Sequence, residues 1–285
     1  MTRTKRRLHI IGIFCTTLFL VQLSAVAQTP PSAQPAAADN EYQTGAILWM
    51  QSSGEYRALA YQTFVLARLR LDEYLRGSSG RQTRKSRASI GKPAVIVDVD
   101  ETVMDNSRYN AELLLRGLSN NSQRWREWCQ RAEAGAVPGA VDFLNYAASR
   151  GVRVFYITNR RESAKPGTVL NLRKLGFPDV SEETVMVRSE DAPPSKESRR
   201  QQVAARYRVV LLMGDNLNDF ADNFAGKAIV DRAAEVDRFR VEFGAKFIVL
   251  PNPLYGDWED AVYQYKSGLK DADKQALRRA ALKGM

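Results

Sequence analysis

The chain has 285 residues and a formal net charge of +10 at pH 7, with 42 Lys and Arg against 32 Asp and Glu. Its single histidine, His9, lies in an N-terminal segment that we expect to be removed. This excludes Ser-His-Asp catalysis, phosphohistidine chemistry and His-ligated zinc. Only Cys129 of the two cysteines would remain, so no internal disulfide could form. Catalysis must then rest on carboxylates, lysine, hydroxyls and a hard metal ion.

Residues 1–27 have the pattern of a secretory signal peptide. Basic side chains between Arg3 and Arg7 precede an apolar run from Leu8 to Leu23, and small residues favour cleavage after Ala27. We therefore expect a periplasmic or secreted protein with no stable membrane span after cleavage.

Two alternatives to a cleaved signal are an uncleaved anchor and a lipid on Cys15. Phe14 disfavours the lipid, because a small residue is wanted just before a lipidated cysteine. Cleavage would remove four basic and no acidic side chains and lower the formal net charge to +6. Such a surface suits anionic substrates. No basic run interleaved with aromatic residues is present, so we expect no nucleic-acid partner.

The remaining chain is expected to contain a linker, a helical segment and an α/β core. Residues 28–40 are rich in Pro, Ala, Ser and Gln, as in a disordered linker. Residues 41–92 are the N-terminal helical segment: apolar side chains at helical spacing over residues 41–76 predict two helices, which end at Gly77-Ser-Ser-Gly80. Residues 93–268 form the core, with a helical insert at 103–136, and a basic helical tail follows at 269–285.

Within the core, predicted strands and helices alternate. Strands are predicted at residues 94–97, 152–157, 184–188, 209–213 and 247–250, and helices at 167–175 and 195–205. Such alternation implies an α/β fold with a parallel sheet and helices on both faces. The insert and the first helical segment would add a smaller helical subdomain.

The first predicted strand of the core ends in two aspartates. The apolar run Ala94-Val-Ile-Val97 is followed by Asp98, Asp100 and Thr102, and open α/β sheets bind ligands at the carboxyl ends of their strands. Unpaired carboxylates there would be costly unless a cation were bound. Later elements add a hydroxyl, a lysine and a second acid pair, namely Thr158, Lys196, Asp215 and Asp219. Their joint occurrence predicts phosphate chemistry at one edge of the sheet.

These segments resemble the haloacid-dehalogenase (HAD) superfamily of phosphohydrolases. The closer resemblance is to its class C acid phosphatases, bacterial nucleotidases with four aspartates. It covers about residues 41–268 and implies a HAD-like Rossmannoid core. The resemblance is carried by Val97-Asp-Val-Asp-Glu-Thr102, Phe155-Tyr-Ile-Thr-Asn-Arg160, Lys196, Gly214-Asp-Asn-Leu-Asn-Asp219 and Leu250-Pro-Asn-Pro-Leu-Tyr-Gly-Asp-Trp258.

The resemblance and the chemistry of phosphate esters imply the same roles for three acids. Asp98 would be the nucleophile that forms an aspartyl-phosphate, and Asp100 would be the general acid and base. Mg²⁺ would be held by the carboxylates of Asp98 and Asp215 and by the backbone carbonyl of Asp100.

Three further residues would bind or orient the phosphoryl group. Thr158 and Lys196 would bind its oxygens, and Asp219 would orient Lys196 or a metal-bound water. Each also has an ordinary structural interpretation. Thr158 could be a hydroxyl at a strand end, Lys196 an exposed lysine on a helix, and Asp219 an aspartate at the start of a helix.

Substrate recognition is implied by the resemblance. Trp125 and Tyr255 align with aromatic positions that clamp the nucleoside base, and stacking tolerates any base. Asn159 and Arg160 are further substrate-binding candidates. We therefore expect a secreted Mg²⁺-dependent acid phosphatase for nucleoside 5′-monophosphates and aryl phosphates, and the resemblance allows a homodimer.

Three other functions are compatible with the same residues. They are a HAD phosphatase for other small esters such as sugar or lipid phosphates, a phosphotransferase, and a non-catalytic surface binding or storage protein on the same scaffold. The aromatic pair argues against sugar phosphates. The presence of all four aspartates argues against a protein without catalysis.

Overall fold

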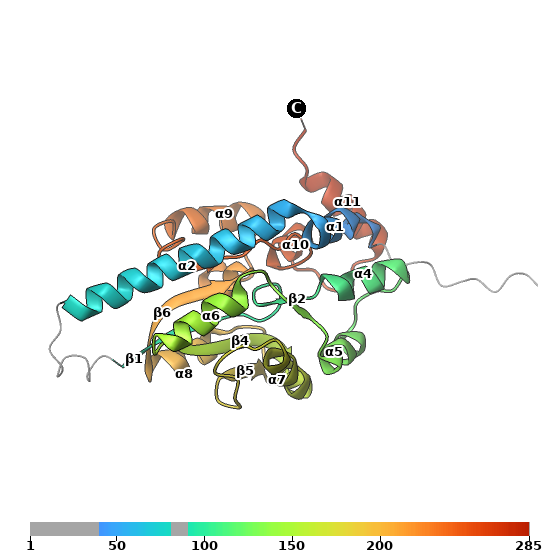
Figure 1. Cartoon of the computed structure of the whole chain (residues 1–285). Coiled ribbons are helices and arrows are strands. Elements are labelled where there is room, and N and C mark those ends of the chain that lie inside the picture. The colour runs from blue at the N-terminus through green and yellow to red at the C-terminus, as the bar shows by residue number, and fades with distance from the viewer. Residues whose placement is uncertain (1–39, 81–90, 285) are drawn as a thin grey trace, which may run out of the picture. The chain divides into compact units, whose positions relative to one another are not determined.

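The computed structural model describes residues 40–80 and 91–284 (Figure 1). The predicted signal peptide and all but one residue of the predicted linker lie outside these ranges. None of the helices within them combines the length and the apolar character needed to span a bilayer.

Five strands form one parallel sheet, as the alternation of elements predicted. They are, in spatial order, β5 (Val185–Arg188), β4 (Arg153–Arg161), β1 (Lys92–Val97), β6 (Tyr207–Gly214) and β7 (Phe247–Val249). Each neighbouring pair is parallel. The first strand in the chain therefore lies in the middle of the sheet, and Asp98 follows it where a ligand crevice is expected.

Helices cover both faces of the sheet (Figure 1). Alternate residues of β1 point to opposite sides, because side chains in a strand have a period of two. Val95 and Val97 belong to a buried cluster that includes residues of α2, α6 and α7. Ala94 and Ile96 belong to a second cluster that includes Val203 of α8. These helices are α2 (Gly54–Gly80), α6 (Ala140–Ser149), α7 (Lys165–Lys174) and α8 (Glu197–Ala204).

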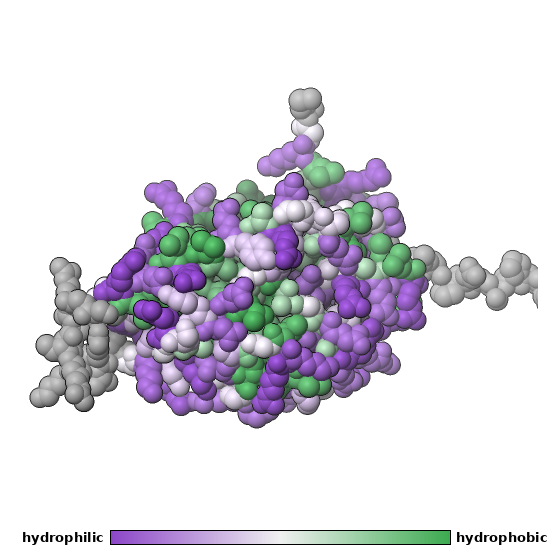
Figure 2. All heavy atoms as spheres, viewed as in Figure 1, coloured by the Kyte–Doolittle hydropathy of each residue, from purple (hydrophilic) through white to green (hydrophobic). Residues whose placement is uncertain are grey.

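The long helix α2 is part of the cover of the sheet. Its buried side chains recur every three or four residues and are Tyr56, Ala60, Phe64, Ala67 and Leu71, which is the spacing of one helix face. The helix continues to Gly80, through the glycine and serine residues that were predicted to end it. On the face seen in Figure 2, hydrophobic residues are interspersed with hydrophilic ones, as on most protein surfaces.

Two leucines of α2 provide a matched test of this packing. Leu71 is 0% exposed and Leu69 is 54% exposed. We expect Leu71→Ala to lower the free energy of unfolding by about 2–5 kcal/mol, because it leaves a cavity between helix and sheet. Leu69→Ala should change it by less than about 0.5 kcal/mol. Urea unfolding of both variants measures the difference, and equal values would contradict this placement of α2.

The insert contains two helices closed by a small sheet. The helices are α4 (Ser107–Leu115) and α5 (Ser122–Arg131), and the strands are β2 (Met104–Asp105) and β3 (Gly135–Ala136). The two strands pair antiparallel, which the sequence did not predict. They bring both ends of the insert back to the same edge of the core, next to the loop that carries Asp98 and Asp100.

The N-terminal and C-terminal elements lie around the same end of the sheet. Helix α1 (Thr44–Ser52) packs on α4, and its Ile47 and Met50 form a buried cluster with Leu254. Helix α9 (Ile229–Arg238) precedes β7 in the chain, and α10 (Asp257–Val262) and α11 (Asp271–Ala281) follow β7. Short 3₁₀ segments are η1 (Glu41–Gln43), η2 (Glu162–Ala164), η3 (Leu217–Asp219) and η4 (Asp222–Phe224).

Candidate active site

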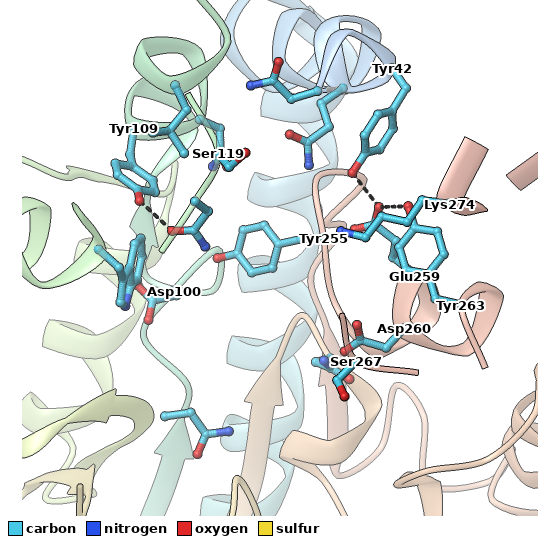
Figure 3. Close-up of a pocket in the computed structure, with 18 of the residues that line it drawn as sticks. Tyr42, Asp100, Tyr109, Ser119, Tyr255, Glu259, Asp260, Tyr263, Ser267 and Lys274 are labelled. Atoms are coloured by element: carbon cyan, nitrogen blue, oxygen red, sulfur yellow. Dashed lines mark hydrogen bonds between the residues drawn. The ribbon is translucent and has the colours of Figure 1, made fainter. Parts of the chain in front are cut away.

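A cavity of about 730 Å³ opens beyond the carboxyl ends of β1, β4 and β6 (Figure 3). Of the site residues predicted from the sequence, all line this cavity except Thr158. The nine that line it are Asp98, Asp100, Trp125, Asn159, Arg160, Lys196, Asp215, Asp219 and Tyr255. The fold therefore brings together residues that are up to 157 positions apart in the chain, from Asp98 to Tyr255.

Three carboxylates meet at the base of the cavity. One oxygen each of Asp98, Asp215 and Asp219 lies within 4.8 Å of the others. Both oxygens of Asp215 accept a hydrogen bond: Thr102 Oγ1 donates to Oδ1 at 3.1 Å, and Asn252 Nδ2 donates to Oδ2 at 2.8 Å. Neither Thr102 nor Asn252 was given a role from the sequence. Together they fix the orientation of the Asp215 carboxylate.

Gly214 permits the close approach of Asp219. A Cβ atom at position 214 would lie 2.3 Å from Asp219 Oδ2, which is impossible without displacing that side chain. The same Oδ2 accepts a hydrogen bond from the backbone N–H of Asn216 at 3.0 Å. The glycine of this motif is therefore required by the tight turn that places Asp219 beside the other acids.

Lys196 neutralises part of this acidic cluster. It is 5% exposed, so it is not the exposed helix lysine of the alternative interpretation. Its Nζ forms ion pairs with Asp98 Oδ1 and, at 2.6 Å, with Asp219 Oδ1. Burial alone would lower the pKa of Lys196, but the Asp219 and Asp98 carboxylates outweigh burial and raise its pKa. Burial raises the pKa of the Asp98 carboxyl, and the Lys196 ammonium opposes that shift.

Two buried arginines of α8 donate hydrogen bonds to β4 and to η3, the segment that follows β6. Arg199 Nη1 donates to the carbonyl of Thr158 at 2.5 Å, and its Nη2 donates to Asn159 Oδ1 at 2.8 Å. Arg200 Nη1 donates to the carbonyls of Asn218 and Asp219 at 2.9 and 3.2 Å. One helix thus positions Lys196 and ties it to two strand ends. Sequence reasoning missed both arginines, because basic residues on a polar helix usually face solvent.

The predicted phosphoryl-binding Thr158 contacts Asp100. It is fully buried, and its Oγ1 donates to Asp100 Oδ2 at 3.4 Å and accepts a hydrogen bond from the Arg160 N–H at 3.1 Å. Arg160 forms an ion pair with Asp100, with Nη2 at 2.8 Å from Oδ1. The structure therefore groups Thr158 and Arg160 around the side chain of Asp100.

Aromatic side chains form one wall of the cavity. Trp125 packs edge-on against Tyr109, with ring centroids 5.2 Å apart. The ring of Tyr255 projects into the cavity between this wall and the opposite one (Figure 3). Trp125 and Tyr255, the predicted base clamp, thus border the same space. Trp258 is 44% exposed, and its Nε1 donates to the carbonyl of Tyr255 at 3.2 Å.

The opposite wall comes from segments that were not given a role from the sequence. Tyr42, Glu259, Tyr263 and Lys274 line it (Figure 3). The hydroxyls of Tyr42 and Tyr263 both donate to Glu259 Oε1 at 2.7 Å. Lys274 belongs to α11, so the predicted basic tail contributes to the cavity. Tyr42 and Glu259 are 217 positions apart, so their contact leaves no local pattern that could have predicted this wall.

Comparison with known proteins identifies the family. A family model described as HAD superfamily, subfamily IIIB (acid phosphatase), matches residues 16–258. The chain belongs to this subfamily. The resemblance noted from the sequence motifs is thereby confirmed, as is the HAD-like α/β fold.

A solved structure and a curated relative that are named acid phosphatases are similar to this chain. The structure of the class C acid phosphatase from Bacillus anthracis is 39% identical, covers 86% of this chain and 98% of its own, and superposes with a TM-score of 0.78. Acid phosphatase 1 of Solanum lycopersicum is 28% identical over 58% of this chain and 59% of that protein. The stem 28 kDa glycoprotein of Glycine max is 23% identical over 58% of this chain. The chain covers about three fifths of the length of these curated relatives.

The acidic cluster of this subfamily IIIB protein fits a hard divalent cation. Lys196 pairs with Asp98 and Asp219, and Arg160 pairs with Asp100. Among the described residues Asp215 has no ion pair, so these four carboxylates and two cations carry two net negative charges when all are ionised. The donors are all oxygen atoms, which suits Mg²⁺. Asp98, Asp215 and Asp219 could each offer one oxygen.

Binding of a divalent cation should depend steeply on pH. Burial, and next the Asp219 carboxylate, raise the pKa of Asp215 to about 7 from 3.8. Because the cation binds the ionised carboxylate, its affinity should fall about tenfold for each pH unit below 7. Titration calorimetry with Mg²⁺ at several pH values measures this dependence, and a constant affinity would contradict it.

The raised pKa of Asp215 also makes the stability of the metal-free protein depend on pH. Between pH 3.8 and about 7 the folded metal-free protein binds more protons at Asp215 than the unfolded chain does. Its free energy of unfolding should therefore decrease as pH rises through this window. Added Mg²⁺ should raise the melting temperature more above pH 7 than below pH 5. The Asp215→Asn variant has no carboxyl to titrate at this position. The rise in its melting temperature on adding Mg²⁺ should therefore differ much less between pH above 7 and pH below 5.

Proposed function

We propose that this protein is a Mg²⁺-dependent acid phosphatase that hydrolyses phosphate monoesters through an aspartyl-phosphate at Asp98. The observation that carries the proposal is the convergence of Asp98, Asp215 and Asp219 around Lys196 beneath one cavity. Membership of subfamily IIIB supports it, as does the tungstate bound to the 39% identical class C acid phosphatase from Bacillus anthracis. Tungstate, like phosphate, is a tetrahedral oxyanion.

In the first step the ester bond breaks. A bound Mg²⁺ would supply positive charge that reduces the repulsion between carboxylate and phosphate. A carboxylate oxygen of Asp98 attacks phosphorus and forms the aspartyl-phosphate bond. The bond from phosphorus to the leaving oxygen breaks, its electron pair goes to that oxygen, and the carboxyl proton of Asp100 is transferred to it. Lys196 binds a phosphoryl oxygen and stabilises the charge that develops there.

In the second step water releases the phosphate. Asp100, now a carboxylate, accepts a proton from the water while the water oxygen attacks phosphorus. The aspartyl-phosphate bond breaks and its electron pair returns to Asp98. The products are inorganic phosphate and the starting form of the enzyme. Asp219 keeps Lys196 in place through their 2.6 Å ion pair.

Nucleoside 5′-monophosphates and aryl phosphates are the substrates we propose. Trp125 and Tyr255 border the cavity above the acids and could stack on a ring of the leaving group. Asn159 also borders the cavity and is exposed, so it can donate a hydrogen bond to a substrate.

Replacing Trp125 tests the base clamp. We expect Trp125→Ala to lower kcat/KM for a nucleoside monophosphate by about 10–100-fold, because base stacking contributes about 1–3 kcal/mol. An alkyl phosphate without a ring should be hydrolysed as by the wild type and serves as the matched substrate control. Equal kcat/KM values for the nucleotide with Trp125→Ala and wild type would rule out the clamp.

The proposed activity is tested by magnesium-dependent phosphate release. A chromogenic phosphate ester at mildly acidic pH should release inorganic phosphate with Mg²⁺ and far less after chelation. Nucleotide binding without phosphate release would instead favour the non-catalytic binding protein. Phosphate transfer to an added alcohol in place of release would favour the phosphotransferase.

We also propose that the mature protein is periplasmic or secreted, begins at Gln28 and forms a homodimer. The location rests on the signal pattern of residues 1–27, and the dimer rests on the resemblance alone. N-terminal sequencing of the exported protein and sedimentation equilibrium test the two statements. A retained N-terminus would contradict the first, and a monomer at all concentrations would contradict the second.

A further inference from the structure

One oxygen of the Asp100 carboxylate is surrounded by fixed donors. Arg160 Nη2 and Nε lie 2.8 and 3.0 Å from Asp100 Oδ1, and Asn106 Nδ2 lies 2.9 Å from the same atom. Within residues 40–80 and 91–284, the other oxygen, Oδ2, has only longer contacts, 3.2 Å to Arg160 Nε and 3.4 Å to Thr158 Oγ1. Because Oδ1 already accepts from three donors, a proton on this carboxyl belongs on Oδ2.

Arg160 is itself held from behind. Its side chain is 1% exposed, and Nη1 donates to Thr168 Oγ1 of α7 at 3.1 Å. Its Cζ lies 5.5 Å from the centroid of the Trp125 ring. The guanidinium is therefore fixed by Asp100 on one side and by α7 on the other. A guanidinium committed in this way has few donors left for a substrate.

The orientation of the Asn106 amide is determined by its partners. Trp128 Nε1 donates to Asn106 Oδ1 at 2.8 Å, and Arg160 Nη2 lies 3.4 Å from it. Both partners can only donate, so the amide oxygen must face them and the NH₂ group must face Asp100. The backbone N–H of Asn106 also donates to Glu101 Oε1 at 2.8 Å. Glu101 has a φ of +56°, so this bond helps to hold a strained residue next to Asp100.

We infer that Arg160 and Asn106 are positioning residues for the general acid, holding Asp100 so that Oδ2 faces the leaving oxygen. This inference rests on the proposed phosphatase function. It replaces the substrate-binding role that the sequence suggested for Arg160. It also gives Trp128 and Thr168 a function, since each orients one of the two positioning residues.

Two aryl esters of nearly the same shape separate positioning from substrate binding. Phenyl phosphate has a poor leaving group that needs a proton, whereas 4-nitrophenyl phosphate has a good one that needs it little. We expect Arg160→Lys and Asn106→Ala to lower kcat for phenyl phosphate by about 10²–10⁴-fold, the usual contribution of general acid catalysis. For 4-nitrophenyl phosphate the loss should be less than about tenfold, so the ratio of the two rates changes.

Arg153→Gln is the matched control. Arg153 lies at the other end of β4, pairs with Asp179 and does not line the cavity, so its variant should keep the wild-type ratio. Thr168→Val is a milder change that removes the 3.1 Å contact to Arg160 Nη1. It should shift the ratio in the same direction by a smaller factor, and it tests the inference even where an Arg160 variant fails to fold.

The outcomes distinguish this inference from the function on which it rests. A larger loss for phenyl phosphate in the Arg160, Asn106 and Thr168 variants supports positioning. Equal losses for both esters, or a change in KM alone, would overturn positioning while leaving the phosphatase activity established. A wild-type protein that releases phosphate from neither ester would overturn the proposed function, and the inference with it.

Discussion

Replacing Asp98 by asparagine should abolish phosphate release. The amide has the shape of the carboxyl but cannot attack phosphorus, so kcat should fall by on the order of 10⁴-fold or more. The fold should remain intact, because Lys196 keeps its 2.6 Å ion pair with Asp219. Steady-state rates with a chromogenic ester and circular dichroism of the same sample measure both quantities.

The control for this variant is a neutral substitution of the same kind. Asp237 is exposed on α9 and does not line the cavity, so Asp237→Asn should retain wild-type rates. Activity retained by Asp98→Asn would remove Asp98 from the role of nucleophile. Loss of the fold in that variant would show that the carboxylate is needed for structure.

Replacing Lys196 by methionine should impair both stability and catalysis. Lys196 is 5% exposed and neutralises Asp98 and Asp219, so its loss leaves two buried carboxylates without a cation. We expect the free energy of unfolding of the metal-free protein to fall by about 3–5 kcal/mol. With Mg²⁺ bound, kcat should fall by about 10²–10³-fold, the cost of removing one electrostatic contact to the transition state.

A double variant separates the two effects of Lys196→Met. Adding Asp219→Asn removes one of the uncompensated carboxylates and should restore part of the stability, because the two residues are in contact. It should not restore kcat. Lys174→Met, at the exposed end of α7, is the control for loss of a lysine. Full stability of the single Lys196 variant would contradict the buried ion-pair network.

The fold and the cluster of acids were predictable because their signals are local. An apolar run such as Ala94-Val-Ile-Val97 forms a buried strand, and the polar residues at its end must then lie at the carboxyl edge of a parallel sheet. Asp215 likewise follows directly after a strand of the sheet, β6. Three strand ends in one sheet meet at one edge whatever the details of the helices, so the cluster of acids follows from topology.

The contacts that refine the site were not predictable in this way. Arg160 directly follows Asn159 in one motif, yet one is buried against Asp100 and the other is exposed. Both residues line the cavity, and the pairing of β4 with β5 is irregular between Ile157 and Arg161, where both lie. Asn252 likewise donates a hydrogen bond to Asp215, 37 positions away, and Arg199 donates one to Asn159, 40 positions away. Such contacts arise from tertiary packing, which has no periodic signature in a single sequence.

The most direct test of the account is to trap the phosphorylated enzyme. Full-length protein with Mg²⁺ and a phosphate ester would be quenched in acid during turnover, reduced with borohydride and analysed by peptide mass spectrometry. The acyl phosphate, and hence its reduced product, should lie at Asp98 and should be missing from Asp98→Asn. A phosphoryl group on any other residue, or phosphate release without a covalent adduct, would contradict it.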